Sequence, residues 1–223
     1  MSLNILLKRL ADNTKATSFA TQLRQKRFQF FLDLLTTVPR PVTILDVGGT
    51  QVFWEMMGFV DLLGIHITLL NLHKQEVSHT NFEAIVGDAT NLVDIKTNQF
   101  DVVFSNSVIE HVGNYDQQRR MAQEIQRVGK RFFVQTPNYY FPIEPHFLFV
   151  GFQWLPVSTR AWLINHFNLG WIKRVPDPTE ARECVEQIRL LRKHDFQALF
   201  PGAHLYEEKV IGLTKSFVLY NDW

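Results

Sequence analysis

Short hydrophobic runs alternate with longer amphipathic stretches through the first part of the chain. Each run is about as long as a strand and closes in glycine or polar residues, a pattern typical of strands buried on both faces. The stretches between the runs place apolar residues at helical spacing. This alternation predicts a parallel β-sheet with helices on both faces. The predicted strands span residues 42–47, 65–70, 82–86, 100–105 and 131–135.

Helices are predicted before and between these strands. A first helix over residues 18–35 is ended by Pro39 and Pro41. After the first strand, apolar residues between positions 53 and 63 are spaced for one face of a helix. Residues 115–128 are polar and periodic, which predicts an exposed helix.

The last third of the chain has a different pattern, because aromatic residues and prolines crowd between positions 139 and 156. Ser158 or Thr159 is expected to cap a helix that ends at residue 167, and Thr179 to cap another that ends at residue 188. A short amphipathic helix is expected to end near residue 200. The tail then predicts a hairpin with strands at 205–211 and 216–220, turning near residue 212.

Composition narrows the possible classes of protein. The 223 residues suit one α/β domain, and 46% hydrophobic residues suffice for a core. The net charge of +1 gives no support for a nucleic-acid partner. One cysteine, Cys184, allows no internal disulfide and no cysteine-rich zinc site, which favours the cytoplasm. The first nine residues lack the hydrophobic run of a signal peptide, and no apolar stretch approaches the about 18 residues of a transmembrane helix.

Polar and small residues follow the predicted strands. In open α/β sheets, ligands bind beyond the carboxyl ends of the strands. A ligand site is therefore expected where these clusters meet. They comprise residues 46–49, Asn71, Asp88, residues 105–106 and residues 136–138.

Three of these segments together resemble a known family. Ile-Leu-Asp-Val-Gly-Gly at residues 44–49 resembles the first motif of class I methyltransferases that use S-adenosylmethionine (SAM). Gly-Asp-Ala at 87–89 resembles their acidic adenine-side motif, and residues 100–112 are similar to their fourth-strand segment. The matches follow the family's order within residues 42–137, somewhat under half of the chain. The resemblance is to the branch that acts on small molecules or lipids.

This resemblance implies a doubly wound, Rossmann-like sheet of seven strands, mostly parallel with an antiparallel C-terminal strand and with helices on both faces. We expect a single domain over residues 1–223. Its expected parts are a helical cap (1–41), a cofactor-binding half (42–137), an aromatic-rich insertion with helices (138–202) and a terminal hairpin (203–223).

The resemblance also implies how the cofactor is held. Glycines in the first turn let the backbone approach the methionine part of SAM, and the next helix start offers N–H groups to its carboxylate. The family's motif acid supports the ammonium end through this turn. An acid after the third strand accepts a hydrogen bond from the adenine amino group, and the fourth strand lines the floor. The cofactor-binding residues implied are Asp46, Gly48, Gly49, Asn71, Asp88, Ala89, Ser105 and Asn106, and S-adenosylhomocysteine (SAH) would be the product.

Two departures from the family pattern concern cofactor binding. Thr50, Gln51 and Val52 follow Gly48 and Gly49, so the third glycine is missing. Asn71 stands where the family usually has an acid that binds both ribose hydroxyls. An amide forfeits the charged hydrogen bonds of a carboxylate, so Asn71→Asp is expected to bind SAM at least as tightly. Asn71 as a residue that fixes a turn is the alternative.

Candidate residues for the reaction itself lie after the fourth and fifth strands. His111 follows the fourth strand and is the candidate general base; a role in capping or in binding a backbone carbonyl is the alternative. The candidate substrate-binding residues lie in the aromatic segment and are Tyr139, Glu144 and His146. The alternative is that the rings of this segment fill the core or form a lid. The other histidines show no paired metal-ligand spacing, so no metal is expected.

Together these features predict methyl transfer from SAM to an uncharged or amphiphilic small-molecule, glycan or lipid-type acceptor, on oxygen rather than nitrogen or carbon. Residues 139–156 are also expected to form a mobile lid or to touch a membrane surface peripherally. Two alternatives stay open. An NAD(P)-dependent oxidoreductase would require Gly-x-Gly-x-x-Gly and an acid after the second strand. A non-catalytic scaffold would account for the missing glycine and for Asn71.

Overall fold

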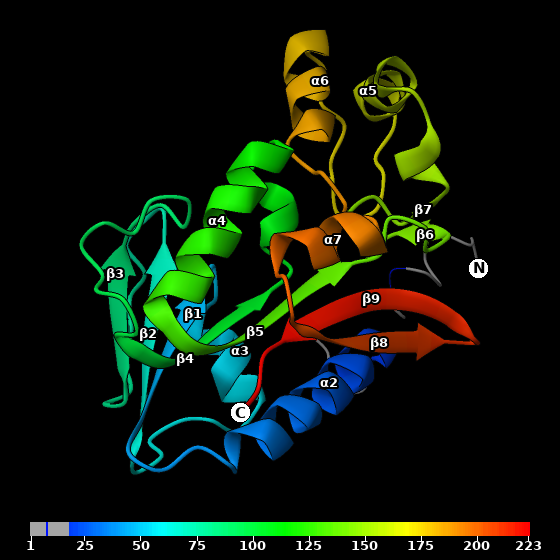
Figure 1. Cartoon of the computed structure of the whole chain (residues 1–223). Coiled ribbons are helices and arrows are strands. Elements are labelled where there is room, and N and C mark those ends of the chain that lie inside the picture. Colours follow the sequence, from blue (N-terminus) through cyan, green and yellow to red (C-terminus); the bar gives the residue numbers. More distant parts are fainter. Residues whose placement is uncertain (1–7, 9–17) are drawn as a thin grey trace.

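The computed structural model describes residue 8 and residues 18–223 and shows a central seven-stranded sheet flanked by helices (Figure 1). The strand order is β3-β2-β1-β4-β5-β9-β8, and all neighbours pair in parallel except those of β9. This confirms the predicted doubly wound sheet with an antiparallel C-terminal strand. The strands are β1 (Val42–Val47), β2 (Ile65–Asn71), β3 (Phe82–Val86), β4 (Phe100–Asn106), β5 (Gly129–Pro137), β8 (His204–Val210) and β9 (Leu213–Tyr220).

Alternate side chains of each central strand enter two different cores, one on each face of the sheet. In β1, Ile44 belongs to the core beneath α2 (Phe19–Leu35) and α3 (Gln51–Met56), where the rings of Phe104 and Phe133 stack at 5.6 Å. Leu45 belongs to the opposite core, beneath α4 (Tyr115–Val128) and α7 (Lys193–Leu199). Because strand side chains alternate between faces, the continuous hydrophobic runs of the sequence are explained by burial on both faces.

The helix after β1 is shorter than its apolar spacing predicted. α3 ends at Met56, and Leu63 is 91% exposed rather than part of a buried face. Gly58 adopts φ +74° directly after the helix, its N–H bonds Glu55 O, and the N–H of Phe59 bonds Trp54 O. These two bonds form a Schellman motif, which terminates a helix at a left-handed residue.

The prediction that α4 is exposed was wrong on one face. Asn114 caps α4 in a reciprocal capping box with Gln117. Its buried face consists of Gln118, Met121, Ala122, Ile125 and Val128. Five such positions at helical spacing make the helix amphipathic, although its average composition is polar.

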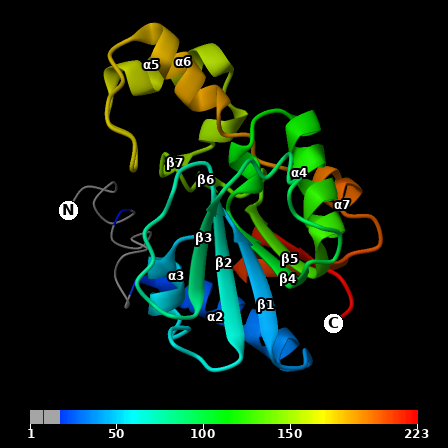
Figure 2. The ribbon, with the colours of Figure 1, turned by 90° about the vertical axis from the view of Figure 1, so that its left-hand side faces the viewer.

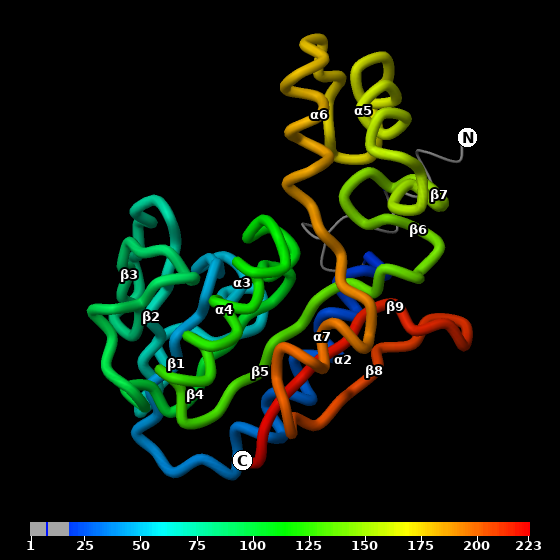
Figure 3. Tube along the Cα trace, turned by 45° about the horizontal axis from the view of Figure 1, so that its top comes forward, coloured from blue at the N-terminus to red at the C-terminus, as the bar shows by residue number. Residues whose placement is uncertain are grey.

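The segment between β5 and β8 builds a small separate cluster above the sheet. It contains the two-residue strands β6 (Ile143–Glu144) and β7 (Phe149–Val150), followed by α5 (Val157–His166) and α6 (Pro178–Glu186). α5 and α6 lie side by side, away from the sheet (Figures 1 and 3). They lie beyond the end of the sheet toward which the arrow of β3 points (Figure 1). Phe147, Phe152, Ile164, Leu169, Ala181 and Val185 form its core.

Both predicted helix caps in this segment were wrong. α5 begins at Val157 after Pro156, without a side-chain cap. α6 is capped by Asp177, whose carboxylate accepts the N–H groups of Thr179 and Glu180. Asp-Pro is a strong helix start because Pro178 loses no hydrogen bond at the first helical position. Of the predicted N-terminal cap, residues 1–7 and 9–17 lie outside the described residues.

Candidate functional site

The predicted polar clusters meet at the carboxyl edge of the sheet, beside the point where the strand order reverses between β1 and β4. At such a point the helices that follow the two strands lie on opposite faces, which opens a crevice for a ligand. The insertion with α5 and α6 stands over this edge (Figure 2).

The turn after β1 depends on two glycines. Gly48 has φ +74°, and a Cβ there would lie 2.6 Å from Val108. A Cβ on Gly49 would lie 1.6 Å from Asp46 Oδ2. The backbone therefore passes directly over the Asp46 carboxylate, and no larger residue fits at either position.

Asp46 supports this turn from below. It is 1% exposed, and its Oδ2 accepts a hydrogen bond of 2.7 Å from Trp54 Nε1 on α3. Desolvation raises the pKa of Asp46 to about 7, partly offset by the Trp54 bond. Asp46 thus links the end of β1 to α3.

Asn71 also holds the turn. Its Nδ2 donates to Gly49 O at 2.9 Å. The amide nitrogen is therefore bound to the glycine turn, while the carbonyl oxygen has no hydrogen-bond partner in the described part of the chain. A carboxylate at this position has no proton to give Gly49, which changes the expectation for Asn71→Asp.

Asp88 and Ala89 follow β3. Asp88 is exposed, and its Oδ1 accepts hydrogen bonds from the N–H and the hydroxyl of Thr90, at 2.8 and 2.9 Å. This is an Asx-type turn, and it fixes the direction of the carboxylate. Ala89 packs against the core beneath α4.

Ser105 and Asn106 at the end of β4 lie in different environments. Ser105 is fully buried, with its hydroxyl 3.5 Å from Val47 O. Asn106 Oδ1 accepts from Arg27 Nη2 at 2.9 Å, and Arg27 Nη1 pairs with Glu208 Oε1 at 2.8 Å. Arg27 was missed by sequence reasoning, because nothing in the sequence pattern brings α2 and β8 to the end of β4.

His111 lies in a short 3-10 helix, Ile109–His111, directly after β4. Its Nε2 is 3.1 Å from Nε2 of His146, which lies between β6 and β7. His146 Nδ1 is 2.6 Å from Glu144 Oε1. Glu144 Oε2 accepts the backbone N–H groups of His146 and Phe147, both at 2.7 Å. The structure therefore joins three predicted site residues into one hydrogen-bonded chain.

The surroundings of the two histidines shift their pKa values in opposite directions. Desolvation and the neighbouring His146 hold the pKa of His111 below its usual range, although part of its ring is exposed. Desolvation also lowers the pKa of His146, but the hydrogen bond and charge of Glu144, assisted by Glu110, outweigh it and raise that pKa. His146 is therefore the protonated partner when the pair takes up a proton.

Glu110 lies beside the two histidines. It is fully buried; Oε2 accepts from the Thr136 hydroxyl at 3.0 Å, and Oε1 has no hydrogen-bond partner among the described residues. Desolvation raises the pKa of Glu110 to about 7. Potential ligand atoms of Glu110, His111 and His146 lie within 4.8 Å of one another, close enough for one divalent cation. This grouping is spatial and was not predicted.

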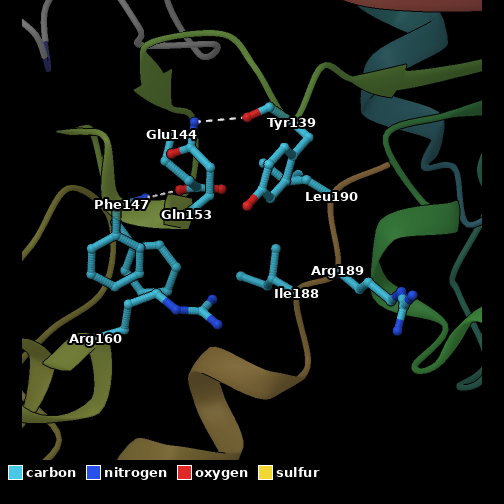
Figure 4. Close-up of a pocket in the computed structure, with 9 residues that line it drawn as sticks. Tyr139, Glu144, Phe147, Gln153, Arg160, Ile188, Arg189 and Leu190 are labelled. Atoms are coloured by element: carbon cyan, nitrogen blue, oxygen red, sulfur yellow. Dashed lines mark hydrogen bonds between the residues drawn. The ribbon is translucent and has the colours of Figure 1, made fainter. Parts of the chain in front are cut away.

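A cavity of about 200 Å³ opens inside the insertion. Tyr139 and Glu144 line it, with Phe147, Arg160 and Ile188. Figure 4 shows the Tyr139 hydroxyl and the Arg160 guanidinium directed toward the same space, whereas Arg189 points away. Neither Ser105 nor His111 lines this cavity, so the wall predicted beside them is displaced toward α5 and α6.

The aromatic residues of the insertion are divided between its core and its surface. Phe147 and Phe152 are buried and stacked at 4.0 Å, as the core alternative predicted. Other apolar side chains of the insertion are about half exposed; these are Tyr140, Val150, Trp154, Trp162, Phe167 and Trp171. Among the helices of the described residues, none has both the length and the hydrophobicity of a membrane span.

Comparison with known families gives one domain match. Residues 45–131 match the model of a methyltransferase domain. Two uncharacterized proteins of Mycobacterium tuberculosis are 40% identical over 53 residues, which are 24% of this chain. The match spans only 18% of the length of each of those relatives.

Solved structures share the fold at low identity. A SAM-dependent methyltransferase from Aquifex aeolicus aligns over 99% of this chain and 98% of its own, with 13% identity and a TM-score of 0.50. The N-terminal domain of EvdMO1, solved with SAH and D-fucose, aligns over 89% and 82%, with 15% identity and a TM-score of 0.53. A Rhodobacter sphaeroides protein described as a zinc-dependent alcohol dehydrogenase aligns over 85% and 87%, with 13% identity and a TM-score of 0.55. These likenesses concern the fold.

Proposed function

We propose that this chain, which has the domain and the fold of class I SAM-dependent methyltransferases, transfers the methyl group of SAM to an oxygen atom of a small-molecule, glycan or lipid-type acceptor. The observation that carries the proposal is the turn at Gly48 and Gly49, supported by Asp46 beside the reversal of strand order. Methyl transfer needs little covalent chemistry from the protein, because the sulfonium methyl is already activated. Positioning and exclusion of water are the main tasks.

The cofactor residues are proposed from their places along the edge. Gly48 and Gly49 let the backbone meet the methionine part of SAM, and buried Asp46 faces the turn that would hold the ammonium group. The carbonyl oxygen of Asn71 can accept one ribose hydroxyl while its nitrogen holds Gly49. Asp88 and Ala89 would receive adenine, and Ser105 and Asn106 would form the floor.

An oxygen acceptor is favoured by the groups around the edge. His111 offers a neutral imidazole, as a base for a hydroxyl must be, and its lowered pKa makes it a weaker base than a free histidine. The cavity of the insertion is lined by the apolar rings of Phe147 and Phe152 and by polar groups that include Tyr139, Gln153 and Arg160. Such walls suit a sugar ring or the polar end of an amphiphile. We propose Tyr139 as a direct acceptor contact.

The first test is calorimetric titration of SAM and SAH into the full chain, with NAD as the rival ligand. We expect SAM and SAH to bind and NAD not to bind. Asp88→Ala should weaken SAM binding by about one kcal/mol, because it removes the acceptor of the adenine amino group. Binding of NAD without SAM would overturn the proposed function in favour of the oxidoreductase.

The proposed base is tested by His111→Ala. With hydroxyl acceptors such as sugars, phenols and hydroxy fatty acids, release of SAH should fall by roughly a hundredfold, while SAM affinity stays nearly unchanged. His66→Ala, which changes an exposed histidine at the start of β2, is the matched control. Equal losses of thermal stability and activity in His111→Ala would mark a structural residue instead.

A non-catalytic scaffold is the second candidate, and Asn71 is the observation that favours it. Its amide nitrogen holds the turn instead of the ribose. Binding of SAM with no SAH released across the acceptor panel would support this candidate.

The proposed surroundings are the cytoplasm, with peripheral membrane contact through residues 139–156 of the insertion. The single cysteine, Cys184, is free and supports a reducing compartment. The exposed aromatic side chains Tyr140 and Trp154 support contact with an interface, where rings with one polar atom are favoured. The near-neutral charge gives nucleic acid no support as a partner.

A further inference from the structure

The polar chain Glu144–His146–His111 connects the insertion to the sheet edge. Glu144 is 2% exposed, and its two oxygens are fixed by His146 Nδ1 and by two backbone N–H groups. Sequence reasoning placed Glu144 and His146 against the substrate. Their contacts join Glu144 to His146 and His146 to His111, while Glu144 also lines the cavity of the insertion.

We infer that Glu144 and His146 are positioning residues that select the tautomer of neutral His111 and take over the positive charge that arises there during methyl transfer. This inference rests on the proposed role of His111 as the base. It adds two residues and a named atom to that role: His111 Nδ1 is the atom that takes the proton.

The tautomer follows from counting protons. A neutral imidazole carries one N–H, and His146 uses its own at Nδ1 to donate to Glu144 at 2.6 Å. His146 Nε2 must then accept, so His111 Nε2 supplies the proton of the 3.1 Å bond. The lone pair of neutral His111 consequently lies on Nδ1, on the opposite edge of its ring from His146.

The reaction step balances without another reagent. The acceptor hydroxyl gives its proton to His111 Nδ1, and its oxygen forms the new bond to the methyl carbon. The carbon–sulfur bond breaks, and its electrons stay on sulfur, giving neutral SAH. The Nε2 proton of His111 then passes along the 3.1 Å bond to His146 Nε2, and the Glu144 carboxylate stabilises the resulting His146 imidazolium.

The charged groups around the pair set the direction of the pH dependence. The negatively charged groups that act on His146 are Glu144 and Glu110. The positively charged Arg160 lines the same cavity as Glu144. The first proton taken up by the pair goes to His146. His146 Nε2 then donates the hydrogen bond to His111 Nε2, and the proton of His111 moves to Nδ1, which is no longer free to act as a base. Activity should therefore fall on the acid side with an apparent pKa that belongs to the pair. Removing the charge of Glu144 should move this limb to lower pH by about one unit.

The decisive experiment needs no acceptor. Long-range ¹⁵N NMR of the full chain, above the pKa of the pair, should show His146 as the Nδ1–H tautomer and His111 as the Nε2–H tautomer. A His146 Nε2–H tautomer would overturn the inference, even if methyl transfer is found. A stoichiometric metal ion in the purified protein that is lost in His146→Gln would also overturn it, because the ring nitrogens would then be ligands.

Kinetics supply the second measurement. Glu144→Gln keeps an acceptor oxygen but loses the charge, so kcat should fall about tenfold, with the acid limb shifted to lower pH and SAM affinity unchanged. Glu207→Gln, on β8, is the matched control and should change neither. If the acid limb of the pH profile does not move in Glu144→Gln, the proposed link from Glu144 through His146 to His111 is contradicted. If no acceptor is turned over at all, the proposed function fails, while the tautomers seen by NMR still test the hydrogen-bonded link from Glu144 through His146 to His111.

Discussion

At the scale of single residues, the site depends on very close approaches between side chains and backbone. Asp46, Gly49 and Asn71 form one unit, in which the carboxylate lies under the turn and the amide holds its carbonyl. The unit gives Asn71 a structural role, because its amide holds the carbonyl of Gly49 in the turn.

Gly49→Ala should disrupt this unit. The new Cβ would overlap Asp46 Oδ2, so the turn must shift away from the position that SAM requires. We expect SAM affinity to fall at least about tenfold, which corresponds to about 1.4 kcal/mol. The control is Gly202→Ala, where the backbone has φ +79° but no atom lies within 4 Å of the added Cβ. Calorimetry that finds unchanged SAM affinity in Gly49→Ala would contradict the role of the turn.

Asn71→Asp should weaken SAM binding, contrary to the expectation from sequence. The carboxylate would face Gly49 O at about the present 2.9 Å without a proton between them. Losing this bond is expected to cost about 1 kcal/mol, or about fivefold in affinity. Titration of SAM against the exposed control Asn91→Asp checks the result. Tighter binding by Asn71→Asp would show that the ribose contact dominates at this position.

At the scale of elements, α2 is fixed to the sheet by more than hydrophobic packing. Phe28 and Phe31 pack beneath the helix, and Arg27 bridges it to Asn106 on β4 and to Glu208 on β8. Glu208 also contacts Lys215 and Ser216, so the carboxylate is shared by three elements. One buried ion pair thus sets the position of the helix that covers the end of β4.

Arg27→Met should therefore destabilise the fold strongly. It leaves the carboxylate of Glu208 buried with only Lys215 and Ser216, and breaking a buried pair typically costs about 3 kcal/mol. The double variant Arg27→Met, Glu208→Gln should recover part of the loss, because the buried carboxylate is removed while Lys215 loses its partner. Urea unfolding followed by circular dichroism measures both. A single variant as stable as the parent would show that the pair contributes nothing.

At the scale of the whole molecule, the insertion is a second hydrophobic body placed over the sheet edge. Its own core encloses Phe147 and Phe152, while Trp162, Phe167 and Trp171 remain about half exposed. Exposed Lys173 and Arg174 follow these rings. Aromatic rings beside cations are suited to the interface of an anionic membrane.

Removing these rings should reduce membrane association. We expect the triple variant Trp162→Ser, Phe167→Ser, Trp171→Ser to bind vesicles of phosphatidylcholine and phosphatidylserine at least about fivefold more weakly than the parent, because apolar area is lost from the contact. The control Leu63→Ser, Ile211→Ser removes two highly exposed apolar residues elsewhere. Sedimentation with vesicles measures both. A parent that does not sediment would contradict membrane contact.

The sequence by itself determined the sheet. The hydrophobic runs at residues 42–47 and 65–70 predicted β1 and β2 to within one residue, because strand formation here depends on local hydrophobicity and on turn residues. The order of motifs predicted the cofactor edge for the same reason: parallel strands place their carboxyl ends together.

Only the tertiary structure decided the contacts across the edge. His111 and His146 are 35 positions apart, and Arg27 and Glu208 are 181 apart, so no periodicity in the sequence could pair them. Their distances follow from how the insertion folds back over β4 and how α2 packs against β8. Local pattern fixes which face of an element is buried, but the chemistry of this site depends on which buried faces meet.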